Sequence, residues 1–314
     1  MHSSVIHLAV ASDARYLTGA IGTLASIRLA VPLETAIHVI FLHDRLSHAE
    51  QQRIHRAMAK LKQGPQIEFM KVDESFAAFP AFYFGSSMAY ARLVLPEKVD
   101  LECLIYIDVD ILVLKDLSEL LRIELPENGV GGVAEHTIAE DMPKVKPLAL
   151  DPEQPYLNSG LLVLDLNKVR RARTFTKALD ILRDHPDACR WHDQSALNYV
   201  FNGAAKALDR SWNILRNQQV LSDPIDALPK LIGRSINVHF NTRAKPWLTP
   251  VPFPAEQMFR VLLDTVDPRL AAGSLCDVFD AQGEGAFRVG HAAVIQRAGP
   301  VSEMDRQGKP MGFP

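Results

Sequence analysis

The first half of the chain alternates short apolar runs with segments in which apolar side chains recur at helical spacing. Ser47 and Glu50 stand at the spacing of a capping box, which predicts that a helix begins there. Alternation of this kind predicts an α/β fold with a mainly parallel central sheet flanked by helices. The predicted strands are residues 5–10, 37–42 and 67–72, and the predicted helices between them are residues 16–30 and 48–61.

The remainder of the chain has a less regular pattern. Glycine and proline become frequent from about Ala272 and periodicity fades, which is typical of a loosely structured tail. We therefore expect one α/β domain over residues 1–254, followed by a C-terminal helix and tail over residues 255–314. The further predicted strands are residues 157–166 and 235–241, and the further predicted helices are residues 86–95, 167–185, 192–201 and 255–266.

Two carboxylates, Asp108 and Asp110, interrupt the apolar run at residues 104–114. If this run is a buried strand, each charge is costly unless something compensates it. A hard divalent cation such as Mg²⁺ or Mn²⁺ does so, because it binds carboxylate oxygens. The pattern thus predicts a metal site at the end of a central strand, although such a pair also occurs in surface loops. Asp13 ends the first predicted strand, and ligands bind beyond the carboxyl ends of parallel strands, so we expect it in the same crevice.

Composition excludes several classes of protein. The chain has 314 residues, 47% of them hydrophobic, and a net charge of −3, so it has no basic field for nucleic acid. No apolar run reaches the roughly 18 to 20 residues that span a bilayer. Cys103, Cys189 and Cys276 are widely spaced and form no CxxC pair, which argues against a zinc–thiolate site and fits a reduced cytosolic protein. We expect Cys103 to be a small core residue.

Six short blocks follow one another in order between residues 5 and 250. The blocks are residues 11–16, 90–93, 106–110, 158–162, 193–198 and 239–247. Together they resemble glycosyltransferase family 8, the retaining nucleotide-sugar transferases. The resemblance implies a GT-A fold with a Rossmann-like, mainly parallel central sheet flanked by helices. It also implies metal-dependent transfer of glucose or galactose, with retention, from a UDP-sugar to a hydroxyl acceptor such as a lipopolysaccharide or another surface glycan.

The resemblance assigns a metal site to Asp108, Asp110 and His239, with Mn²⁺ or Mg²⁺ as the ion. An imidazole among carboxylate oxygens suits Mn²⁺, and the ion would neutralise the charge on the leaving UDP. Arg92 and Lys245 are assigned to the diphosphate and donor sugar, where fixed cations stabilise developing charge. Taken alone, His239 fits a core histidine, and the two cations fit solvated surface charges.

By the same resemblance, Asp13 accepts a hydrogen bond from the uracil base and Tyr16 stacks on it. Tyr16 also suits a core position at a helix start. Gly160 is expected to let the chain approach the ligand closely. The remaining nucleotide-sugar contacts are assigned to Ala11, Val109, Asn158, Ser159, Asp193, Gln194 and Glu135.

Two mechanisms with retention stay open. Double displacement needs a carboxylate nucleophile on the back face of the sugar. The family places an amide there, here Gln194, which is a poor nucleophile. Front-face attack assisted by the leaving phosphate oxygen is therefore expected, and Asp193 as nucleophile is the rival.

Three positions depart from the family pattern. Thr242 replaces a glycine near the diphosphate, Arg15 replaces an asparagine near the ribose, and Ser195 replaces an aspartate. The first two touch the nucleotide pocket, so we expect these departures to bear on base preference and affinity and not on the fold.

Two other functions share part of this pattern. A metal-dependent nucleotide phosphohydrolase also uses an Asp-x-Asp pair, but it leaves the blocks at 158–160 and 245–247 unexplained. A non-catalytic UDP-sugar-binding protein would keep the pocket without turnover. We expect a cytoplasmic protein with a UDP-sugar donor, a glycan or glycolipid acceptor and no nucleic acid partner. The basic cluster at residues 170–173 could contact the inner membrane face or form a solvated helix face.

Overall fold

A seven-stranded sheet with the order β3-β2-β1-β4-β7-β6-β8 forms the centre of the protein. The structure is a computed structural model that describes residues 5–72, 76, 79–81, 85–135, 148, 150–151, 153–215, 236–248 and 254–267. Strands β3, β2, β1 and β4 are parallel, β7 is antiparallel to β4 and β6, and β8 is parallel to β6. The bounds are β1 Val5–Ala11, β2 Ala36–His43, β3 Gln66–Lys71, β4 Cys103–Ile107, β6 Val130–Ala134, β7 Leu157–Asp165 and β8 Lys206–Leu208. The predicted mainly parallel α/β sheet is confirmed.

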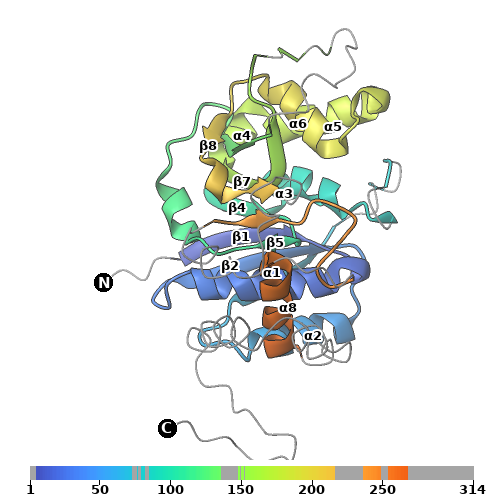
Figure 1. Ribbon diagram of the computed structural model, residues 1–314. Coiled ribbons are helices and arrows are strands. Elements are labelled where there is room, and N and C mark those ends of the chain that lie inside the picture. Colours follow the sequence, from blue (N-terminus) through green and yellow to red (C-terminus); the bar gives the residue numbers. More distant parts are fainter. Residues whose placement is uncertain are drawn as a thin grey trace, which may run out of the picture.

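Helices cover both faces of this sheet, because side chains on each strand alternate between the two faces. On β1, Leu8 and Val10 join the core beneath α1, α2 and α8, whereas Ala9 and Ala11 join the core beneath α3 to α6. Figure 1 shows α4, α5 and α6 at one end of the molecule and α2 and α8 at the other. The helix bounds are α1 Leu17–Ala30, α2 His48–Met58, α3 Leu95–Lys98, α4 Leu166–Ala172, α5 Thr174–Asp184, α6 His192–Phe201 and α8 Pro254–Val266.

A second, three-stranded sheet has the order β5-β10-β9. Its strands are β5 Ile111–Leu112, β9 Ile214–Leu215 and β10 Val238–His239. In the antiparallel pairing of β10 with β5, His239 lies opposite Ile111, the residue that directly follows Asp110. This sheet therefore joins residues more than a hundred positions apart.

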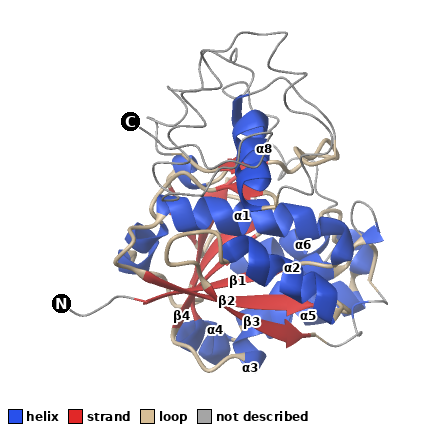
Figure 2. Ribbon diagram, turned by 90° about the horizontal axis from the view of Figure 1, so that it is seen from below, coloured by secondary structure: helices blue, strands red, loops and turns tan. Residues whose placement is uncertain are grey.

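The described part of the C-terminal region packs on the main core. Helix α8 lies against α1, as Figure 2 shows, and the Phe259 ring contacts the rings of Phe240 and Trp247. The boundary expected between residues 254 and 255 stays a prediction, and the expected tail and Cys276 lie outside the described residues. Among the helices that the structure describes, none has the length and apolarity needed to cross a membrane.

Some local predictions are confirmed, and others need correction. The capping box is present, since the Ser47 hydroxyl accepts from Glu50 N and the Glu50 carboxylate accepts from Ser47 N. The run at 104–114 is not one strand, because β4 ends at Ile107 and the acid pair occupies the turn before β5. Of the strand expected at 235–241, the described part forms only the two residues of β10. Cys103 is exposed at the start of β4 rather than in the core.

Two predicted helices are divided. Within 86–95 the chain forms a 3₁₀ helix, Met88–Val94, and α3 then continues past Pro96. Proline is tolerated there because the first turn of a helix needs no N–H donor. The helix expected at 167–185 breaks at Arg173, whose φ of 53° is left-handed and ends α4 before α5 begins.

Candidate active site

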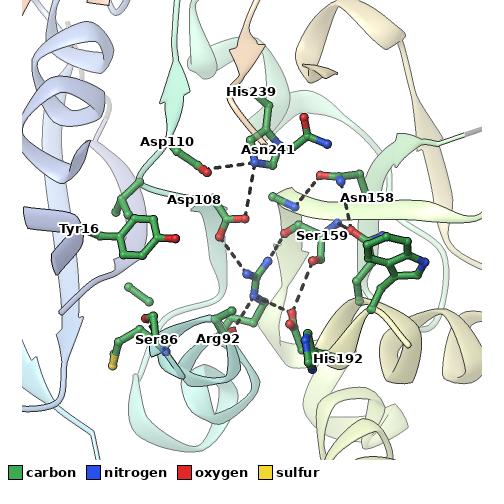
Figure 3. Close-up of a pocket in the computed structure, with 18 of the residues that line it drawn as sticks. Tyr16, Ser86, Arg92, Asp108, Asp110, Asn158, Ser159, His192, His239 and Asn241 are labelled. Atoms are coloured by element: carbon green, nitrogen blue, oxygen red, sulfur yellow. Dashed lines mark hydrogen bonds and ion pairs between the residues drawn. The ribbon is translucent and has the colours of Figure 1, made fainter. Parts of the chain in front are cut away.

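A cavity of about 690 Å³ opens beyond the carboxyl ends of β1 and β4. This is the edge at which a parallel sheet is expected to bind ligands. Figure 3 shows side chains from several distant segments converging there. The lining includes the predicted residues Ala11, Tyr16, Arg92, Asp108, Val109, Asp110, Glu135, Asn158, Ser159, Asp193, Gln194, His239 and Lys245.

Asp108, Asp110 and His239 form a cluster that we call the acid–histidine cluster. His239 Nε2 lies 3.2 Å from Asp110 Oδ1 and 3.9 Å from Asp108 Oδ2. The other oxygen of each carboxylate is held by the protein. Asp108 Oδ1 accepts from Arg92 Nη2 at 2.8 Å and from the Tyr106 hydroxyl at 3.0 Å, and Asp110 Oδ2 accepts from Lys245 Nζ at 2.6 Å. One oxygen of each carboxylate is thus oriented towards His239.

The electrostatic environment keeps Asp110 ionised. Burial alone would raise its pKa, but Lys245 and then His239 outweigh burial and hold the pKa of Asp110 below its ordinary value. Burial raises the pKa of Asp108, and Arg92 opposes this shift. A bound cation would favour the ionised form of both carboxylates, because an opposite charge nearby lowers a carboxyl pKa.

The acid–histidine cluster fits a divalent cation. The ligand atoms that the three side chains offer lie within 4.8 Å of one another. An octahedral ion at about 2.1 Å from each ligand sets neighbouring ligand atoms about 3 Å apart, so small side-chain shifts suffice. Two carboxylate oxygens and an imidazole nitrogen suit Mn²⁺ or Mg²⁺ better than a thiolate-preferring metal.

Arg92 links this cluster to the opposite wall of the cavity. Its side chain is buried, its Nε lies 3.0 Å from Asp193 Oδ2, and its guanidinium also donates to Ser159 O. Figure 3 shows Arg92 between Asp108 and Ser159. The guanidinium also lies over the Tyr106 ring, 4.3 Å from its centroid. One buried cation therefore holds carboxylates from two separate elements.

Asp193 is only 1% exposed. Burial raises its pKa to about 6, although Arg92 acts in the opposite direction. The Ser159 hydroxyl donates to Asp193 Oδ2 at 3.4 Å. The Asp193 carboxylate is consequently engaged by the protein on the side that faces Arg92.

An amide cluster formed by Asn158, Gln194 and Glu135 lies at the far end of the cavity. Gln194 Oε1 accepts from Ser159 N at 3.0 Å and from Asn158 Nδ2 at 3.1 Å. Glu135 Oε2 accepts from Asn158 Nδ2 at 3.0 Å and from Gln194 Nε2 at 3.3 Å. A carboxylate and two amides here can exchange hydrogen bonds with sugar hydroxyls.

Tyr16 and Lys245 line the other end of the cavity, and Trp247 packs behind Tyr16. The Tyr16 ring contacts the Trp247 ring edge to face, with centroids 6.2 Å apart, and Lys245 Nζ lies 5.8 Å from the Tyr16 centroid. Burial raises the pKa of Tyr16, so the phenol is neutral at physiological pH. A half-buried aromatic ring beside a buried cation suits a base and its phosphates.

Asp13 is the one predicted contact that does not line the cavity. It is buried, and its carboxylate accepts from Arg15 N at 2.9 Å and from Arg15 Nη2 at 2.7 Å. Arg15, one of the three departures from the family pattern, is therefore the residue that pairs with the Asp13 carboxylate. The expected hydrogen bond from Asp13 to a base stays a prediction.

The structure also gives contacts to two amides to which the sequence analysis assigned no role, Asn198 at the end of the block 193–198 and Asn213 outside the six blocks. Asn198 joins α6 to β7, since its amide accepts from Leu157 N and donates to Leu157 O. Asn213, which precedes β9, lies between His239 and Asn158. The block 193–198 contains Asn198 but does not reveal its contact with β7, and no sequence pattern identifies Asn213.

Gly160 is necessary because the His239 ring packs directly on its backbone. A Cβ at this position would overlap His239 Cε1 and lie 2.7 Å from Nδ1.

We expect Gly160→Ala to displace the ring and to weaken Mn²⁺ binding about 10- to 100-fold, as loss of a residue that orients a metal ligand typically does. Electron paramagnetic resonance (EPR) of free Mn²⁺ measures this change. Gly132→Ala on β6, whose Cβ would meet the flexible Leu162 side chain at 3.1 Å, is the control. Unchanged Mn²⁺ affinity in Gly160→Ala would contradict the prediction.

Sequence comparison identifies a family and several relatives of this chain. The sequence model of glycosyl transferase family 8 matches residues 7–250. The chain is 25% identical over 259 residues to General stress protein A of Bacillus subtilis (strain 168), covering 77% of this chain and 87% of that protein. It is 26% identical over 272 residues to Lipopolysaccharide 1,2-glucosyltransferase of Escherichia coli (strain K12), covering 83% and 78%.

A solved structure shows the same fold. The galactosyltransferase LgtC, in complex with donor and acceptor sugar analogs, matches with a TM-score of 0.72 and 25% identity, over 86% of this chain and all of that chain. The resemblance inferred from the six sequence blocks and the GT-A fold are confirmed. Since the family match covers well over half of the sequence, the chain belongs to glycosyl transferase family 8 and is a glycosyltransferase.

Proposed function

We propose that the protein transfers glucose or galactose from a UDP-sugar to a hydroxyl group of a glycan, with retention, and that it depends on Mn²⁺ or Mg²⁺. The observation that carries the proposal is the acid–histidine cluster inside a cavity that also holds Lys245 and the amide cluster. Asp108, Asp110 and His239 would hold the ion. When bound, the ion supplies a Lewis acid that neutralises charge on the departing diphosphate.

The two ends of the cavity support the proposed donor. Tyr16 and Lys245 would bind the nucleotide and its phosphates, and Glu135, Asn158 and Gln194 would bind sugar hydroxyls. Relatives named as a lipopolysaccharide glucosyltransferase and a galactosyltransferase support a hexose. They also support a lipopolysaccharide or another surface glycan as acceptor.

Hydrogen bonding within the site favours front-face attack. Gln194 Oε1 already accepts two hydrogen bonds, and the Asp193 carboxylate is paired with buried Arg92. In this mechanism the acceptor oxygen bonds to the anomeric carbon as the bond to UDP breaks, and the acceptor proton passes to the leaving phosphate oxygen. Double displacement through Asp193 is the rival, and it would require this carboxylate to leave its guanidinium.

An acceptor of this class would bring the protein to the inner membrane face from the cytoplasm. The basic cluster at 170–173 contributes less to such a contact than its sequence suggests. Arg170 donates to Pro96 O at 2.7 Å and to Val99 O at 2.5 Å, so its charge is used inside the fold. Arg171 and Arg173 remain exposed.

UDP release tests the proposal. With Mn²⁺ and either UDP-glucose or UDP-galactose, we expect release to increase with the concentration of a truncated lipopolysaccharide and to stop when EDTA is added. UDP release at a rate that does not depend on the acceptor concentration would instead support a nucleotide phosphohydrolase. UDP-sugar binding without release under any of these conditions would support a non-catalytic binding protein.

A further inference from the structure

A chain of buried hydrogen bonds connects the acid–histidine cluster to the amide cluster through Asn213. His239 Nδ1 lies 3.1 Å from Asn213 Oδ1, and Asn213 Nδ2 lies 2.8 Å from Asn158 Oδ1. Asn213 is 1% exposed and His239 is 4% exposed. Both ends of one amide side chain are therefore used to join the expected metal site to the expected sugar site.

The backbone N–H of Gly160 determines the direction of the hydrogen bonds that link His239, Asn213 and Asn158. Gly160 N can only donate, and it donates to Asn158 Oδ1 at 2.9 Å. The Asn213 atom facing that oxygen must then be the NH₂ group, so the other Asn213 atom is the carbonyl oxygen. That oxygen can only accept, so His239 Nδ1 carries the proton.

This direction has a consequence for the acid–histidine cluster. With its proton on Nδ1, His239 directs Nε2 towards Asp110 and Asp108. Without an ion, a proton on Nε2 can hydrogen-bond Asp110 Oδ1 at 3.2 Å; with an ion in place, the Nε2 lone pair can bind it, because Nδ1 already holds the other ring proton. A histidine that ligates a metal through one ring nitrogen commonly donates its other N–H to an oxygen acceptor, which fixes its orientation.

The opposite end of the chain is ordered in the same way. Because Asn158 Oδ1 accepts from Asn213 and Gly160, the Asn158 NH₂ group is directed towards Gln194 Oε1 and Glu135 Oε2. The groups that would contact the donor sugar thus depend on the same amide that orients His239.

We propose that Asn213 is a positioning residue that orients His239 for the metal ion and Asn158 for the donor sugar. The proposal rests on the function proposed above. Its two halves can be separated chemically. An aspartate at this position keeps an oxygen acceptor for His239 Nδ1 but lacks the NH₂ group that donates to Asn158, whereas an alanine lacks both groups.

The affinity for Mn²⁺ tests the orientation of His239, and the affinity for the donor tests the orientation of Asn158. Mn²⁺ is titrated by EPR in the presence of saturating UDP, and UDP-glucose and UDP-galactose are then titrated by calorimetry at saturating Mn²⁺. We expect Asn213→Ala to weaken Mn²⁺ binding about 10- to 100-fold. We expect Asn213→Asp to bind Mn²⁺ with near wild-type affinity. We also expect this variant to bind the UDP-sugar no more tightly than UDP, because the contact that orients Asn158 is missing.

Asn237→Asp is the matched control. Asn237 is also fully buried beside β10, and its amide accepts from Leu114 N and Lys115 N and donates to Trp212 O, with no bond to His239. We expect it to lower stability and to leave the Mn²⁺ affinity of the folded protein unchanged. If Asn213→Ala does not fold, Asn213→Asp still decides between the outcomes.

The possible results separate this proposal from the proposed function. Equal loss of Mn²⁺ affinity in Asn213→Asp and Asn237→Asp, or wild-type affinity for both Mn²⁺ and UDP-sugar in Asn213→Asp, would overturn the role of Asn213 alone. Absence of Mn²⁺ binding by the wild-type protein would overturn the proposed metal dependence and this inference together.

Discussion

Asp110→Asn is expected to remove Mn²⁺ binding and to lower kcat/KM for sugar transfer about 10³-fold, which corresponds to the several kcal/mol that metal catalysis supplies. Asp110 has two tasks in the structure. Its Oδ1 faces His239 Nε2, and its Oδ2 holds the Lys245 ammonium at 2.6 Å. The substitution therefore removes a metal ligand and loosens the cation expected to bind the diphosphate.

EPR of free Mn²⁺ and a UDP-release assay measure the two effects. Asp209→Asn is a suitable control, because Asp209 lies outside the cavity and caps a short 3₁₀ helix, a task that asparagine also performs. We expect this control to keep wild-type activity. Wild-type Mn²⁺ affinity in Asp110→Asn would show that the acid–histidine cluster does not hold the ion.

Arg92→Met is expected to lower the free energy of unfolding by about 3–5 kcal/mol, the usual cost of breaking a buried ion pair. The buried carboxylates of Asp108 and Asp193 share this guanidinium, and methionine would leave both without it. Folding raises the pKa of Asp193 to about 6, so protonation of this carboxyl favours the folded state. The loss should thus be smaller at acidic pH and should grow as pH rises through that value.

Urea denaturation of Arg92→Met and of Arg183→Met provides the comparison. Arg183 also pairs with two carboxylates, Asp180 and Asp184, but all three side chains are exposed. Exposed ion pairs contribute little to stability, so we expect no measurable change in the control. Equal unfolding free energies for the two variants would mean that Arg92 does not compensate buried charge.

The elements of the first half could be predicted from sequence because their signals are local. Strands β1 and β2 are short, largely apolar runs, β3 carries Ile67, Phe69 and Met70 between polar residues, and the Ser47 capping box marks the start of α2. Asp108 could be placed at the end of a strand for the same reason. The break at Arg173 could not be predicted, since it depends on one left-handed residue within a continuous amphipathic pattern.

The candidate site could be predicted only as a set of separate segments. His239 reaches Asp110 because β10 pairs with β5. A strand is predicted here, at residues 235–241, but its sequence pattern does not identify the strand with which it pairs. Asn213 has none, because its role depends on two neighbours that are distant in the sequence. The pairing of Arg15 with Asp13 likewise became visible only in three dimensions.

Calorimetric titration of wild-type protein with UDP-glucose and UDP-galactose, first with Mn²⁺ and then with EDTA, tests the central claim most directly. The proposed function predicts that at least one of these nucleotides binds with Mn²⁺ and that removing the metal largely abolishes binding. The preferred nucleotide would identify the donor. Equal affinity with and without Mn²⁺, or no binding of either nucleotide, would contradict a metal-dependent UDP-sugar site in this cavity.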